Sequence, residues 1–127
     1  MEFTLTTTIA AGAEEIYTAW LNAEGHSEMT GGAASITDNI GDSFTAWDGY
    51  IEGKNLELVS NKRIVQTWRT TEFDASEEDS QIEILLNERD GQTELTLIHT
   101  NLPEHGEQYK NGWEEHYFKP MKAYFGK

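Results

Sequence analysis

The stretch from Glu107 to Phe125, EQYKNGWEEHYFKPMKAYF, decides how the rest of the chain folds. Its large apolar residues recur at spacings of four and three, which is typical of one face of an α-helix. At a rise of about 1.5 Å per residue, the helix would be about 28 Å long. Pro120 lies inside it and predicts a kink, because proline removes a backbone hydrogen bond and clashes with the preceding turn. The apolar stripe consists of Tyr109, Trp113, Tyr117, Met121 and Tyr124.

Upstream of this helix, the pattern is mostly that of strands joined by short turns. Residues 1–9 alternate between polar and apolar side chains, as does a strand with one face in water. Two short helices are expected next, over residues 14–21 and about 22–29. The turns that follow are too short for parallel crossovers, so the remaining strands are antiparallel, with a bulge at Gly53. These strands are expected at residues 33–37, 43–47, 50–59, 63–69, 81–88 and 93–101.

These elements predict one α+β domain that spans residues 1–127. Its main feature is a curved antiparallel sheet of about seven strands around a long C-terminal helix, with two short helices after the first strand. One sheet of this size has one apolar face, and only the aromatic stripe of the last helix is large enough to cover it. Because sheets twist with a fixed hand, we expect this sheet to curl around the helix.

Composition and charge exclude several classes of protein and site. Nine Lys and Arg against 23 Asp and Glu give a net charge of −14, which repels phosphate backbones and anionic lipids. No nucleic-acid or membrane partner is therefore expected. The chain has no cysteine, its four histidines lack metal-binding spacing and no glycine-rich nucleotide motif is present, so no metal or cofactor is expected. The start shows no signal-peptide pattern, which favours a cytoplasmic protein.

An ordered series of short segments carries a family resemblance that no single segment would carry. The segments are Trp20-Leu21-Asn22, Gly41-Asp42-Ser43-Phe44, Asp48-Gly49-Tyr50-Ile51-Glu52-Gly53, Leu56-Glu57-Leu58, Arg63-Ile64-Val65-Gln66-Thr67-Trp68-Arg69, Leu95-Thr96-Leu97-Ile98-His99-Thr100-Asn101-Leu102-Pro103 and Gly112-Trp113. In this order they resemble the activator of heat-shock-protein-90 ATPase homologue-like (AHSA-type) family, within the START-like, or SRPBCC, superfamily. The resemblance covers nearly the whole chain.

This resemblance implies the helix-grip fold, in which a sheet grasps the C-terminal helix, often with a cavity between them. Relatives across the superfamily bind lipids, sterols or polyketides, and some catalyse cyclisation or dehydration. The eukaryotic namesake stimulates the ATPase of a stress-response chaperone, heat-shock protein 90, and has a separate N-terminal domain that engages this chaperone. We expect that second domain to be missing here, because 127 residues hold one domain.

The strand expected at 93–101 supplies the most distinctive polar candidates. Leu95, Leu97, His99 and Asn101 share one side of it, and the two leucines mark that side as inward. An inward histidine beside an asparagine is suited to orienting a ligand carbonyl or to moving a proton. The plain structural interpretation is a buried histidine whose ring nitrogens are both hydrogen-bonded to neighbours.

Other candidates come from the strand at 63–69 and from the helices. Trp68 and Gln66 share a side with Ile64, although Val65 favours the opposite facing. Aromatic side chains build apolar pocket walls and an amide fixes orientation, but the same residues are also suited to ordinary core packing. The predicted ligand-binding residues are Trp20, Gln66, Trp68, Ile84, Leu97, His99, Trp113, Tyr117 and Met121.

Three functions stay open at this point. The first is binding of a small hydrophobic or amphipathic ligand, which predicts a cavity above about 300 Å³ between sheet and helix. The second is a chaperone-associated interaction domain with heat-shock protein 90 as its partner, which predicts an apolar surface patch rimmed by charge. The third is a cyclase or dehydratase that uses His99 as acid and base; a wholly buried His99 would count against it. No residue is assigned as catalytic, and a non-enzymatic role is favoured.

Overall fold

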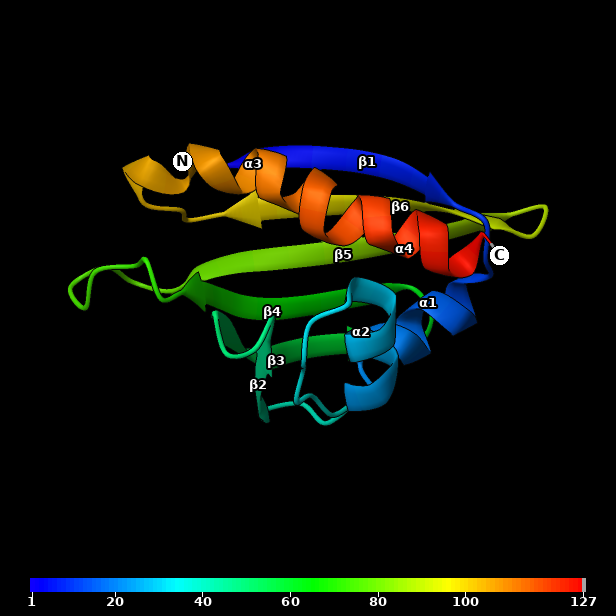
Figure 1. The fold of residues 1–127 in the computed structure, drawn as a ribbon, viewed down its shortest axis with the longest axis horizontal. Coiled ribbons are helices and arrows are strands. Elements are labelled where there is room, and N and C mark those ends of the chain that lie inside the picture. The colour runs from blue at the N-terminus through cyan, green and yellow to red at the C-terminus, as the bar shows by residue number, and fades with distance from the viewer. Residues whose placement is uncertain (127) are drawn as a thin grey trace.

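Six antiparallel strands form one sheet, and the helices lie against one face of it in this computed structural model, which describes residues 1–126 (Figure 1). The strand order is β1-β6-β5-β4-β3-β2, so the first and last strands of the chain are neighbours. The strands are β1 (Phe3–Ile9), β2 (Ser43–Ala46), β3 (Ile51–Val59), β4 (Arg63–Thr70), β5 (Ser80–Arg89) and β6 (Gln92–Thr100). The helical segments are α1 (Ala13–Trp20), α2 (Ala23–Thr30), η1 (Glu104–Glu107), α3 (Gln108–Trp113), η2 (Glu114–Phe118) and α4 (Lys119–Phe125).

The predicted α+β architecture is confirmed, with six strands where the sequence predicted about seven. The strand expected at 33–37 is reduced to one isolated bridge, in which Ser35 and Thr45 exchange two backbone hydrogen bonds of 2.9 Å. The bulge expected at Gly53 lies instead between Asn55 and Glu57. Gly53 has a different reason to be glycine, since a Cβ there would lie 1.9 Å from the carbonyl oxygen of Thr67.

Capping interactions mark the ends of the two short helices after β1. Asn22 caps α2 by accepting a hydrogen bond of 2.8 Å from the backbone of Gly25, as the sequence predicted. Gly31 ends α2 with a left-handed φ of 91°, a conformation that favours glycine. The first helix begins where the Glu88 carboxylate accepts from the Ala13 N–H at 2.8 Å, so a strand side chain caps it.

The C-terminal helical run contains an irregular turn. Residues of η2 form a π-helix in which the N–H of Lys119 donates to the carbonyl of Glu114, a wider turn than in an α-helix. Pro120 follows directly, in the first turn of α4, and has no N–H to continue the helical hydrogen bonds. The predicted kink at Pro120 stays a prediction, while the π turn beside it is a feature that the sequence analysis did not foresee.

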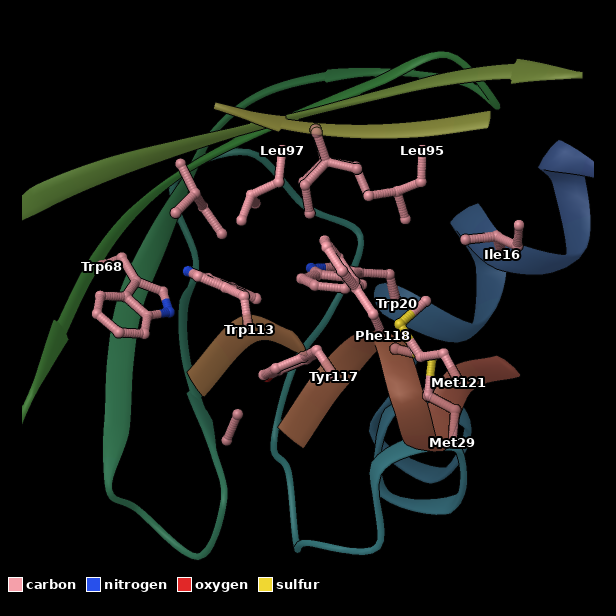
Figure 2. Packing of buried hydrophobic residues seen from close by; sticks show 14 of the residues in the cluster. Ile16, Trp20, Met29, Trp68, Leu95, Leu97, Trp113, Tyr117, Phe118 and Met121 are labelled. Carbon is pink, nitrogen blue, oxygen red and sulfur yellow. The ribbon is translucent and has the colours of Figure 1, made fainter. Parts of the chain in front are cut away.

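The core lies between the helix-facing side of the sheet and the C-terminal helical run (Figure 2). The predicted stripe is buried along most of its length, at Tyr109, Trp113, Tyr117 and Met121. Opposite it, β5 and β6 pair Ile84 with Leu97, and both side chains are buried. Within residues 1–126, no helix is long and apolar enough to cross a bilayer.

Candidate functional site

Large rings fill the space between the sheet and the C-terminal helix. Trp113 stacks near Trp20 with ring centroids 6.3 Å apart, and its centroid lies 5.6 Å from that of Trp68 and 4.7 Å from that of Tyr117. Trp20 comes from α1, Trp68 from β4, and Trp113 and Tyr117 from the C-terminal run (Figure 2). Rings at these separations are in contact, so the interior predicted as a cavity is occupied by side chains here.

His99 lies inside this aromatic layer and is fully hydrogen-bonded. Its Nδ1 accepts from the indole N–H of Trp113 at 3.0 Å. The neutral ring therefore carries its proton on Nε2, which lies 2.9 Å from Ser80 Oγ and donates to it. Ser80 in turn donates to the backbone carbonyl of Trp68 at 2.6 Å. This directed chain of hydrogen bonds fixes the tautomer of His99 and leaves no free ring nitrogen.

Burial determines the charge of His99. The side chain is 0% exposed, and desolvation lowers its pKa to about 3. The ring is therefore neutral at physiological pH and is not exposed to solvent. A general acid or base must exchange protons with substrate or water, so this geometry counts against the interpretation of His99 as the acid/base of a cyclase or dehydratase.

A second buried histidine, His26 on α2, pairs with the C-terminal helix. Its Nδ1 donates to the carbonyl of Trp20 at 2.8 Å, so its Nε2 accepts from the hydroxyl of Tyr117, also at 2.8 Å. Burial lowers the pKa of His26 to about 4 and raises the pKa of Tyr117. The buried Tyr117 hydroxyl is therefore paired with a side chain. Tyr124, further along the same stripe, is half-buried, and its hydroxyl donates to Glu28 at 3.1 Å.

A line of amides connects α1 to the loop before β2. The indole N–H of Trp20 donates to Gln66 Oε1 at 3.2 Å, and Gln66 Nε2 donates to Asn55 Oδ1 at 2.8 Å. Asn55 Nδ2 then donates to the backbone carbonyls of Thr37 and Asn39 at 2.8 and 3.0 Å. Every member of this line is paired, which is the usual state of buried polar groups in a stable core.

An open cleft lies beside this packed interior. It has a volume of about 420 Å³ and lies between the tip of the β2–β3 hairpin and the segment formed by α3 and η2. Trp47 and Ile51 line it on the hairpin side, and Gly112 and His116 on the helical side. The other lining residues are Tyr50, Trp68, Gln108, Tyr109, Asn111, Trp113 and Tyr117.

The predicted site residues are gathered in one place but serve mainly as core. Three of them, Trp68, Trp113 and Tyr117, also line the cleft. Contact of any of the nine with a ligand stays a prediction. All nine are buried: Trp20, Gln66, Trp68, Ile84, Leu97, His99, Trp113, Tyr117 and Met121.

The sequence analysis misplaced one polar residue of this region and missed two others. Asn101 was expected inward beside His99, and this expectation is wrong. The strand ends at Thr100, and Asn101 is exposed with a left-handed φ of 56°, donating to the carbonyl of Asp79. Ser80 and His26 were not selected, because their partners are distant in sequence. No group of metal-binding side chains occurs among the described residues.

Comparison with known proteins identifies the family of this chain. A model of the family described as "Activator of Hsp90 ATPase homolog 1-like protein" matches residues 10–126. The chain belongs to this family. Its relatives include the human activator of 90 kDa heat shock protein ATPase homolog 1, 28% identical over 98% of this chain and 37% of the human protein. An uncharacterized protein of Schizosaccharomyces pombe is 28% identical over 94% of this chain and 35% of its own length. The chain thus spans little more than a third of the curated relatives it matches.

Solved structures share this fold. A crystal structure of an HSP90 activator from Plasmodium falciparum superposes with a TM-score of 0.90 at 22% identity, covering 99% of this chain and 96% of that one. The Aha1 dimer from Colwellia psychrerythraea gives a TM-score of 0.81 at 18% identity, covering 98% and 96% of the two chains. At these identities the likeness establishes the fold, and function needs its own argument.

Proposed function

We propose that this domain binds a heat-shock protein 90-type chaperone and raises its ATPase rate. The observation that carries this proposal is the family match over residues 10–126. The protein with the TM-score of 0.90 is itself described as an HSP90 activator and has nearly the same length of chain. An activity of this kind requires contact with a protein surface and no chemistry inside the domain.

The closed interior supports a role for the outer surface. His99, His26 and Gln66 all have their polar atoms paired within the core, so none of them is available to a substrate. The net charge of −14 favours a partner with a basic face, because opposite fields accelerate encounter and like charges oppose it. Association should then weaken as salt screens the charges.

The experiment is a steady-state ATPase assay with the heat-shock protein 90 of the same organism. The complete chain is titrated into the chaperone, and a specific inhibitor of the chaperone ATP site defines the background rate. We expect the inhibitor-sensitive rate to rise to a plateau, and to rise less at high salt. A binding titration under the same conditions accompanies the assay. If the titration shows no binding and no change in the ATPase rate, the proposal is overturned.

A second proposal, that the domain holds a small apolar or amphipathic molecule, is favoured by the cleft of about 420 Å³. This volume lies within the range of about 300–1,000 Å³ that is typical of small-molecule sites. The cleft lies beside the packed aromatic core, between the strand residues Ile51 and Trp68 and the C-terminal helical run. Native mass spectrometry of the protein purified from its own host tests it: a retained small molecule supports the proposal, and a mass equal to that of the bare chain contradicts it.

A further inference from the structure

Gly112 keeps the floor of the cleft open. It lies inside α3 and lines the cleft, and a Cβ built on it would meet no atom within 4 Å. Glycine is less favourable than alanine inside a helix, and here neither a close approach nor a left-handed φ requires it. The missing side chain therefore costs helix stability and in return leaves free volume between the helix and the hairpin.

Trp47 forms the opposite wall under strain. Its φ of 51° places a bulky residue in the left-handed region, where such side chains are rare. Its indole Nε1 is buried without a hydrogen-bond partner, alone in this respect among the buried side-chain polar atoms of residues 1–126. Its ring meets that of His116, another lining residue, edge-on, with centroids 5.6 Å apart. Strained residues with unpaired groups gather at binding sites more than elsewhere.

The helical wall is irregular at the same place. His116 and Tyr117 both line the cleft, and both belong to the π turn of η2. Single π turns inside helices occur frequently at functional sites. The free volume, the strained tryptophan and the π turn are independent features, and they meet at one cleft.

The lining determines which molecules the cleft accepts. None of its residues is Asp, Glu, Lys or Arg, so a charge carried into it would lose water without gaining a counter-charge. The protein's net charge of −14 further disfavours anions. The walls are the faces and edges of tryptophan and tyrosine rings, which favour flat aromatic partners. The amides of Gln108 and Asn111 supply polar contacts among the lining residues.

From this geometry we infer that the cleft is a binding site for an uncharged, flat aromatic molecule, held between Trp47 and the helical turn that contains Gly112. This inference rests on the proposed ligand-binding role of the cleft and adds the chemical class of the ligand and the two residues that admit it. It is independent of the chaperone proposal.

The test uses the uncharged naphthalene dye prodan and the anionic dye 1-anilinonaphthalene-8-sulfonate as probes of the complete chain. We expect prodan to bind at one site and the sulfonate to bind at least about tenfold more weakly, a difference of about 1.4 kcal/mol. Gly112→Leu places a side chain in the cleft and should abolish prodan binding. The matched control is Ala123→Leu, which adds the same side chain at an exposed position of α4 and should leave binding unchanged.

A second variant keeps the test independent of the helix. Trp47→Ala removes the opposite wall and should weaken prodan binding by about tenfold or more. Equal prodan binding by the wild type, Gly112→Leu and Trp47→Ala would overturn the placement, and preference for the sulfonate would overturn the assignment of an uncharged ligand. If a compound is retained in native mass spectrometry but prodan does not bind, the ligand class is wrong and the ligand-binding role stands. If neither is bound, both fail.

Discussion

The indole N–H of Trp113 donates to Nδ1 of His99 at 3.0 Å, and this bond joins the C-terminal helix to the central strands of the sheet. Because Nδ1 accepts, the proton of the neutral ring lies on Nε2, which donates a hydrogen bond to Ser80 Oγ. The histidine therefore acts as a fixed connector between β5, β6 and α3. The same residue in a reaction site would need a free nitrogen.

The first prediction compares two tryptophans. Trp113→Phe leaves His99 Nδ1 buried without a donor, which costs about 1–3 kcal/mol beyond the loss of ring contacts. Trp47→Phe removes an N–H that has no partner, so it orphans no acceptor. Urea unfolding of both variants should show Trp113→Phe to be less stable than Trp47→Phe by about this amount. Equal losses would contradict the assigned hydrogen bond.

The second prediction concerns pH. The pKa values of His99 and His26 are lowered to about 3 and about 4 in the folded state, against 6.5 for an ordinary histidine. Between these values the unfolded chain binds more protons than the folded one. The contribution of the two neutral rings to the free energy of unfolding is therefore fully present above about pH 6.5 and falls as the pH decreases. From pH 7.5 to 5.5 each histidine should remove roughly 1 kcal/mol from the free energy of unfolding. His26→Gln should show about half of the wild-type fall, whereas a stability that stays flat over this interval would contradict the neutral assignment.

The third prediction sets two glycines against each other. Gly112→Ala should raise the free energy of unfolding by about 0.5–1 kcal/mol, because the new methyl meets no atom and alanine favours helix. Gly53→Ala should lower it by at least about 1 kcal/mol, because its Cβ would overlap the carbonyl of Thr67. Thermal and urea unfolding measure both. A destabilised Gly112→Ala would show that the open space in front of α3 is absent.

The fourth prediction tests the line of amides. Gln66→Leu leaves the Trp20 N–H and the Asn55 side-chain oxygen buried without partners. The free energy of unfolding should therefore fall by at least about 2 kcal/mol. Gln81→Leu makes the same change on the exposed face of β5, beside Thr67, and is the matched control with little expected effect. If Gln66→Leu loses no more stability than Gln81→Leu, the line of amides does not stabilise the core.

Periodicity explains what the sequence could predict. The alternation of Leu95, Leu97 and His99 assigns these residues to the inward face, and the spacing of Trp113 and Tyr117 puts both on the buried stripe of the helix. Both patterns are local, and burial of apolar surface enforces them whatever the rest of the chain does.

The parts that escaped prediction depend on distant partners or on special backbone. His26 lies 91 residues from Tyr117, so nothing near it in the sequence marks it as part of the core. Trp47 reaches the cleft only because the hairpin takes a left-handed turn at this residue. Asn101 would face inward if β6 continued, but the strand ends one residue earlier. Periodicity holds no information on pairing across the chain or on where a strand stops.

The claim on which this account depends is that the aromatic interior is a closed, neutral core, so that partners and ligands meet the domain from outside. Nitrogen NMR of histidine-labelled protein tests it most directly, by following the ring of His99 from pH 7.5 to 5. We predict a single Nε2-protonated tautomer whose signals do not move over this range. A His99 ring that titrates near pH 6.5, or exchanges between tautomers, would show that solvent reaches the interior and would contradict the account.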